Sequence, residues 1–122
     1  MNKTLLEKMF LKPDYTAAIL NMPDDLKAEL QSSQKIDTSL KNHYNFILAF
    51  YSKAENLEKE ILEVKKASVP NGLLWIAYPK NKALETDINR DILHELMKKF
   101  ELDGVSLVSL NSTWSAMRFK AL

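Results

Sequence analysis

The sequence predicts an α/β fold: a three-layer sandwich whose mostly parallel sheet of five or six strands ends in an antiparallel hairpin. Short apolar runs alternate with amphipathic stretches of helical period, which is typical of parallel strands joined by right-handed crossovers. The runs 45–51 and 73–78 are apolar almost throughout, as strands covered on both faces are. The final runs, 105–110 and 113–120, are joined by the short link Asn111–Ser112, as in a hairpin.

The first elements are short. Apolar residues at helical spacing within 1–12 predict one amphipathic helix, which ends before Pro13. The apolar run Tyr15–Leu20, bounded by breakers, predicts a buried strand. Pro23 and the two acidic residues after it predict the start of a further helix. Residues 34–40 alternate weakly, so both an edge strand and a loop remain open there.

The second half contains two clearer helices. Apolar residues repeat every three to four positions between 54 and 64, and Ser52 is expected to cap that helix. A turn at Pro70–Gly72 precedes the strand at 73–78. Thr86 or Asp87 is expected to cap the last helix. Its predicted buried stripe is Ile88, Ile92, Leu96, Met97 and Phe100.

The order of these elements predicts a topology. Strands 45–51 and 73–78 should be adjacent, parallel and central, because one amphipathic helix joins them. The final strand should insert antiparallel beside 73–78 and leave 105–110 at the edge. Gly104 follows the last helix closely, so we expect a positive φ there.

Composition excludes several classes of function. A net charge of +1 gives no footprint for nucleic acid or for a polybasic membrane contact. The absence of cysteine excludes disulfides, thiolate catalysis and iron–sulfur clusters, and two glycines are too few for a glycine-rich phosphate loop. No apolar run approaches a membrane span or a signal peptide. We therefore expect a single α/β domain over 1–122, located in the cytoplasm.

One region is a candidate ligand site. Ligands of open α/β sheets lie beyond the carboxyl ends of the strands. Lys80 and Arg90 would bring positive charge to the start of the last helix, where a phosphate or carboxylate is favoured. The predicted ligand-binding residues are Lys80, Thr86, Asp87, Arg90 and Trp114. Asp87 and Arg90 could equally pair with each other, and for Trp114 half-buried packing over a helix is favoured over a place in the wall of a pocket.

No catalytic or metal-binding set is predicted. Asp87, Asp91 and His94 share one helical face, but a hard metal needs oxygen ligands from more than one segment. Neither His43 nor His94 has a nucleophile placed on a G-x-S-x-G turn.

Three motifs carry a resemblance to a known family: Y-P-K at 78–80, T-D-x-x-R-D at 86–91 and T-W-S-A-x-R-F at 113–119. Together they resemble a family of small bacterial proteins classed as a domain of unknown function. The resemblance is dense over 69–120 and extends to the rest of the chain only in layout. It implies no activity, since the family has none assigned.

More distantly, the layout is similar to the Rossmann-like methyltransferase fold, which also ends in an antiparallel hairpin. That fold binds adenosylmethionine through a glycine-rich turn after its first strand. The corresponding turn here, 21–25, contains no glycine, so no cofactor is expected.

These observations leave three classes of function. The leading expectation is a small binding or regulatory module without catalytic machinery. The alternative is an enzyme or ligand-binding domain that acts on an anionic small molecule at the carboxyl ends of the strands. The third is a structural protein that docks a partner through a helix face or an edge strand.

Overall fold

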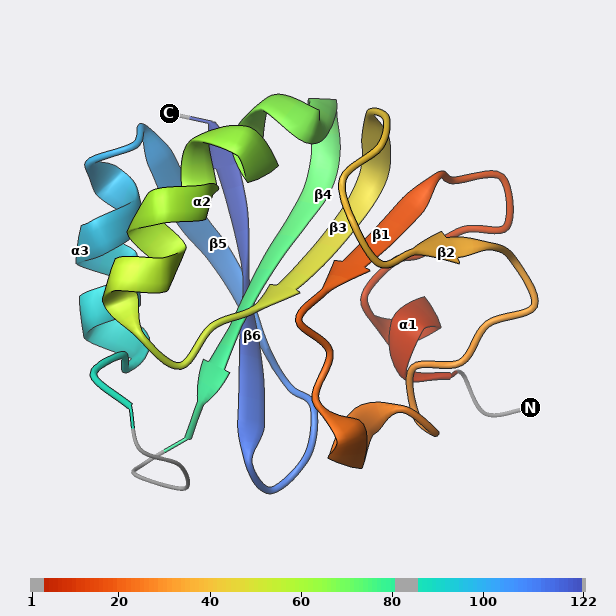
Figure 1. The fold of residues 1–122 in the computed structure, drawn as a ribbon, viewed down its shortest axis with the longest axis horizontal. Helices are drawn as coiled ribbons and strands as arrows, with labels where there is room; N and C mark the ends of the chain where they lie inside the picture. Colours follow the sequence, from red (N-terminus) through yellow and green to blue (C-terminus); the bar gives the residue numbers. More distant parts are fainter. Residues whose placement is uncertain (1–3, 81–85, 122) are drawn as a thin grey trace.

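The computed structural model describes residues 4–80 and 86–121, which form one six-stranded mixed sheet with strand order β2-β1-β3-β4-β6-β5 (Figure 1). The strands are β1 (Ala17–Leu20), β2 (Ile36–Asp37), β3 (Tyr44–Phe50), β4 (Ser68–Pro79), β5 (Leu102–Ser109) and β6 (Trp114–Ala121). The helices are α1 (Leu5–Lys8), α2 (Ala54–Ala67), α3 (Arg90–Lys98) and the single 3-10 turn η1 (Asp24–Leu26).

The centre of the sheet follows the predicted topology. β3 and β4 are adjacent and parallel, and β1 is parallel to both β3 and β2. β6 inserts antiparallel between β4 and β5, which leaves β5 at the edge. β3 is buried almost throughout because it has neighbours on both sides and packed layers on both faces.

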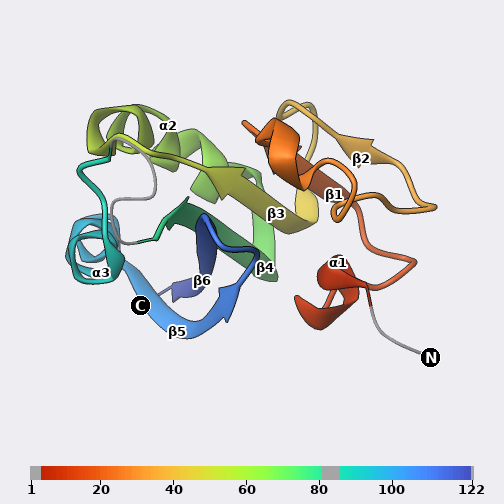
Figure 2. The same cartoon turned by 90° about the horizontal axis from the view of Figure 1, so that it is seen from below.

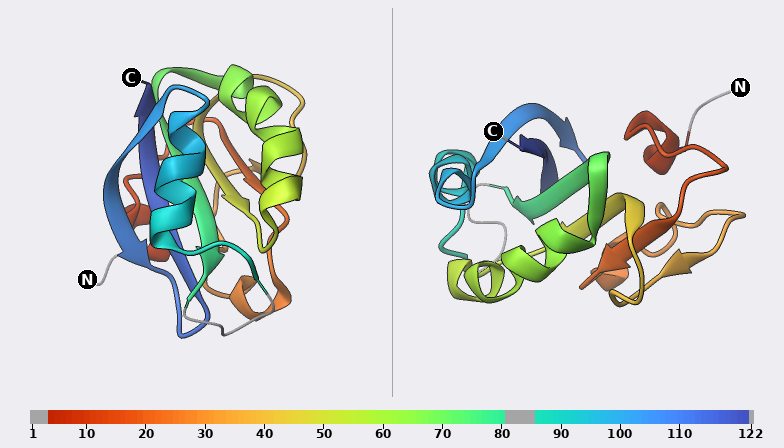
Figure 3. Two further views of the ribbon diagram at one scale, coloured as in Figure 1. Left: turned by 90° about the vertical axis from the view of Figure 1, so that its left-hand side faces the viewer. Right: turned by 90° about the horizontal axis from the view of Figure 1, so that it is seen from above.

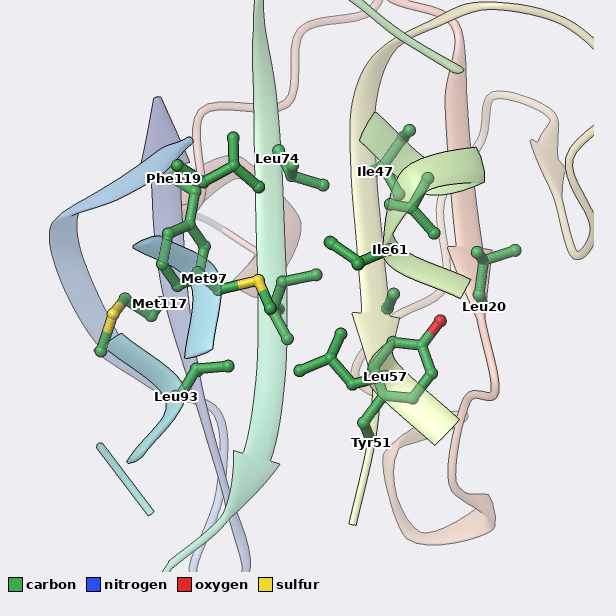
Figure 4. Close-up of a cluster of buried hydrophobic side chains, with 14 of the residues drawn as sticks. Leu20, Ile47, Tyr51, Leu57, Ile61, Leu74, Leu93, Met97, Met117 and Phe119 are labelled. Atoms are coloured by element: carbon green, nitrogen blue, oxygen red, sulfur yellow. The ribbon is translucent and has the colours of Figure 1, made fainter. Parts of the chain in front are cut away.

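The predicted α/β class is correct, but the structure does not confirm three regular layers. On one face, α2 and α3 cover the sheet, and Figure 4 shows Leu57, Ile61, Leu93 and Met97 pointing onto it. The other face is covered by the short α1, by η1 and by irregular chain. Side chains from these segments, among them Leu6 of α1, form the hydrophobic core on that face. Figures 2 and 3 show α1 on the side of the sheet opposite α2. The connections on that side contain too little helix to form a complete layer.

Two predicted boundaries are wrong, and the region left open between an edge strand and a loop is a short edge strand. Pro23 begins only a 3-10 turn. β4 begins at Ser68, directly after α2, and the predicted turn at Pro70–Gly72 lies inside it as an irregularity with Asn71 at φ 63°. The region 34–40 contains a strand of only two residues, Ile36–Asp37.

The predicted helix caps also differ. Asn89, not Thr86 or Asp87, caps α3, because its side chain accepts from the backbone N–H of Ile92. Ile92 itself is 44% exposed, while Leu93 takes the buried position that the predicted stripe omitted. The N-cap residue of α2 is Lys53, whose side chain makes no capping hydrogen bond. Ser52 therefore does not cap this helix.

Gly104 does not have a positive φ; Glu101, at φ 62°, makes the left-handed step after α3. Gly104 lies in β5, at an irregularity of the β5–β6 pairing. A Cβ there would lie 2.6 Å from Met117 Sδ and 3.0 Å from His94 Cδ2. Close packing, rather than backbone conformation, therefore selects glycine.

Within the described residues, no helix is both long and apolar enough to cross a membrane.

Candidate functional site

The order of the strands creates a switch point between β1 and β3. From β1 the chain passes to β2 on one side, whereas β3 lies on the other side of β1. In open α/β sheets, the crevice beyond the carboxyl ends of such strands is the usual ligand site. A hollow of about 430 Å³ lies there, which we call the β1–β3 hollow. Its lining residues are Asn21, Phe50, Tyr51, Ser52, Asn56, Glu60 and Trp114.

Asn21 connects the ends of β1 and β3 at the hollow. It follows β1 with φ 59°, a left-handed conformation that asparagine tolerates better than most residues. Its side-chain Nδ2 donates to the carbonyl oxygen of Phe50 at 3.2 Å. The amide therefore spans the gap between β1 and β3.

Tyr51 and Glu60 form the polar wall of the hollow. Tyr51 is only 3% exposed, and its hydroxyl donates to Glu60 Oε1 at 2.6 Å. Burial raises the pKa of the Tyr51 phenol above its ordinary value, and the hydrogen bond to the Glu60 carboxylate raises it further. Tyr51 thus remains a proton donor, and Glu60 presents a carboxylate held in place.

Phe50 and Trp114 form the aromatic wall. Their rings meet edge to face, with centroids 5.1 Å apart and planes at 85°. The Asn111 Oδ1 accepts from the backbone N–H of Trp114 at 2.7 Å, while Asn111 Nδ2 donates to Asp25 at 2.9 Å. The β5–β6 turn and η1 are thereby tied together at this end of the sheet.

Thr86 and Asp87 hold the loop between β3 and α2. The Thr86 hydroxyl donates to the Ser52 carbonyl at 2.7 Å, and Asp87 Oδ1 accepts from the Ala54 N–H at 2.7 Å. Asp87 is therefore the cap of α2, supplied from a distant part of the sequence. A carboxylate suits that position because helix N-termini carry free N–H groups and a positive dipole end.

Lys80 and Arg90 are not brought together. Lys80 Nζ donates to Ser109 Oγ at 2.5 Å, beside the β5–β6 turn. Arg90 Nε lies 3.5 Å from the Asp91 carboxylate and lines a separate hollow of about 320 Å³ on the α3–β5 side. Of the five predicted ligand residues, only Trp114 lines the β1–β3 hollow, and the ligand-binding role of the five stays a prediction.

The ligand residues predicted from the sequence do not include Phe50, Tyr51, Asn56 or Glu60, all of which line the hollow. Asn56 and Glu60 are four residues apart, on one face of the helix that follows the central strand, and this spacing was the available signal. The contact of Tyr51 with Glu60 depends on the angle at which α2 leaves β3, which no local pattern specifies.

Comparison with known proteins gives structural likeness only. No protein-family model matches the chain, and no curated protein matches it. Among solved structures, LepI in complex with SAM is similar at 16% identity with a TM-score of 0.57. A LepI variant in complex with SAH and substrate analogue is similar at 16% and 0.58, and a structure described as "A Pericyclic Reaction enzyme" at 15% and 0.53. Each match covers 97% of this chain but 39% of the other chain.

These likenesses agree with the more distant, methyltransferase-like layout that the sequence indicates, and at this identity they concern the fold alone. The resemblance to the family of unknown function stays a prediction. The leading expectation of a non-catalytic module is corrected, because one of the similar structures is described as an enzyme and the other two are complexes with SAM or with SAH and substrate analogue.

The residues of this chain do not fit SAM in the manner that such a layout implies. A glycine-rich turn after the first strand lets the cofactor approach the backbone, and a helix N-terminus follows it. Here Asn21 fills that position with its side chain, Pro23 has no N–H, and η1 is three residues long. β2 pairs only with Ala17 and Ala18, at the amino end of β1.

Proposed function

We propose that the protein is an enzyme or ligand-binding domain that takes a small molecule in the β1–β3 hollow. The observation that carries the proposal is the coincidence of this hollow with the switch point of the sheet. Polar groups converge on it from the ends of β1 and β3 and from the first turns of α2. Aromatic walls with a few placed polar groups are what small-molecule sites require.

The polar groups that line the hollow can form hydrogen bonds and transfer protons. The Glu60 carboxylate, held by the Tyr51 hydroxyl, is an acceptor, and the Asn56 amide can both donate and accept. A carboxylate held by a phenol is a reasonable general base, because it is oriented before the ligand arrives. The chain spans about two fifths of the length of the similar solved chains, so their chemistry is not transferred to it.

The residues predicted from sequence have different roles in this proposal. Trp114 contacts the ligand directly. Thr86 and Asp87 act indirectly, because they hold the Ser52–Ala54 segment that forms one side of the hollow. Lys80 and Arg90 would contact only an anionic ligand bound outside this hollow, so the Lys80→Met variant distinguishes the two locations.

The test is a thermal-shift screen of the chain with nucleotides, sugar phosphates, carboxylates and amines. Any compound that raises the melting temperature is then measured with Asn56→Trp, which fills the hollow, and with Glu58→Trp. Glu58 is exposed on the same helix and does not line the hollow, so it is the matched control.

The proposal predicts that Asn56→Trp abolishes the ligand-induced shift, whereas Glu58→Trp and Lys80→Met retain it. A shift that survives Asn56→Trp and is lost in Lys80→Met would contradict the proposed location.

A further inference from the structure

The electrostatic character of the β1–β3 hollow is set by Glu60. Among its described lining residues, Glu60 is the one charged side chain, and neither lysine nor arginine is present. Glu60 is exposed. An anionic ligand that covered it would bring two like charges together, at a cost that grows as water is excluded.

The Glu60 carboxylate is only half engaged. Oε1 accepts the Tyr51 hydroxyl at 2.6 Å, and the structure describes no other hydrogen bond or ion pair of this group. Its second oxygen is therefore available as an acceptor. The neutral phenol orients the carboxylate without cancelling its charge, because burial and the carboxylate itself raise the pKa of Tyr51.

The remaining walls favour the same kind of ligand. Phe50 and Trp114 border the hollow on the side formed by β3 and β6; the two side chains are 3% and 6% exposed and pack edge to face with each other. An aromatic ring at the border of a site attracts a cation rather than an anion, so these residues are compatible with the charge that Glu60 sets. The Asn21 and Asn56 amides add neutral acceptors.

From this arrangement we infer that the ligand of the β1–β3 hollow carries a cationic amine, held by the Glu60 carboxylate, in a hollow that Phe50 and Trp114 border. The inference rests on the proposed function and specifies its ligand class. It replaces the anionic ligand that Lys80 and Arg90 indicate from the sequence.

Three probes of one shape separate charge from fit: benzylamine, which is an ammonium ion at pH 7, benzyl alcohol and benzoate. The dissociation constant of each is measured by NMR titration of the full chain. We expect benzylamine to bind about tenfold more tightly than benzyl alcohol, since hydrogen bonds to charged groups are the stronger ones, and benzoate to bind most weakly.

Two variants locate the interaction. Glu60→Gln can still accept the Tyr51 hydroxyl, so it keeps the local structure, and we expect it to bind benzylamine no better than benzyl alcohol. Glu58→Gln removes the same charge from an exposed position on α2 outside the hollow, and it should retain the wild-type preference.

The inference is overturned if benzoate or benzyl alcohol binds as tightly as benzylamine, or if Glu60→Gln leaves the preference unchanged. Either result leaves the proposed function intact while binding is still blocked by Asn56→Trp. If Asn56→Trp blocks no compound of the thermal-shift screen, the proposed function itself fails.

Discussion

Tyr51 is buried, and burial raises the pKa of its phenol and favours the neutral form. The ring packs in the core beneath α2, beside Leu57 and Ile61 (Figure 4), and the hydroxyl faces the Glu60 carboxylate. The pKa of Tyr78 is also raised, chiefly by burial. A phenol whose pKa is higher in the folded state than in the unfolded state makes stability depend on pH in the alkaline range.

We predict that the free energy of unfolding falls as pH rises above 10. The unfolded state then releases phenolic protons that the folded state still holds, so each such tyrosine lowers stability by up to about 1.4 kcal/mol per pH unit. Below pH 10 these phenols are protonated in both states and their effect is constant. Urea unfolding between pH 9 and about 11.5 should give a shallower decline for Tyr51→Phe than for wild type; an identical slope would refute the raised pKa.

Gly104→Ala should lower the free energy of unfolding by about 1–2 kcal/mol, as overpacking does. The new methyl group would meet the Met117 thioether and the His94 ring. Because Met117 is the nearer obstacle, the cost should be smaller in a Met117→Val background. Denaturant titration of the two single variants and the double variant measures this coupling. Equal stability of Gly104→Ala and wild type would show that the space is not tight.

At the scale of elements, α2 depends on a cap from outside its own sequence. Asp87 Oδ1 accepts from the Ala54 N–H, and Thr86 holds the preceding Ser52 carbonyl. The segment before α3 therefore sets where α2 begins. This coupling places the first turn of α2, with Asn56, at the β1–β3 hollow.

Asp87→Ala should lower the free energy of unfolding by about 1 kcal/mol, the usual value of a lost helix cap. The matched control is Asp14→Ala, in the exposed chain before β1, which should change stability by less than about 0.5 kcal/mol. Both are measured by chemical denaturation. A change no larger for Asp87→Ala than for Asp14→Ala would mean that the cap contributes nothing.

The elements that could be predicted from the sequence are the strands whose residues are apolar at nearly every position. β3 and the second half of β4 are apolar at nearly every position, and few other structures bury such runs. The caps and starts of helices could not be predicted in this way. Asn89, Thr86 and Asp87 all have side chains able to cap, and tertiary contacts decide which helix each one serves.

For the whole molecule, a crevice at the carboxyl edge of the sheet could be predicted, but the residues that line the β1–β3 hollow could not. Parallel strand order alone places a crevice at that edge. Lys80 and Arg90 flank the same segment of sequence, yet they diverge to Ser109 and Asp91. The residues that line the hollow come from segments far apart in the chain, and only the folded sheet brings them together.

The proposed small-molecule site lies at the carboxyl ends of β1 and β3. Titration of the ¹⁵N-labelled chain with benzylamine, followed by mapping of the amide shifts, tests this location. We expect the largest shifts on the backbone of Asn21, Ser52, Asn56 and Trp114 and on the side-chain amides of Asn21 and Asn56. Shifts that cluster instead around Lys80, or around Arg90 and the α3–β5 face, would contradict it.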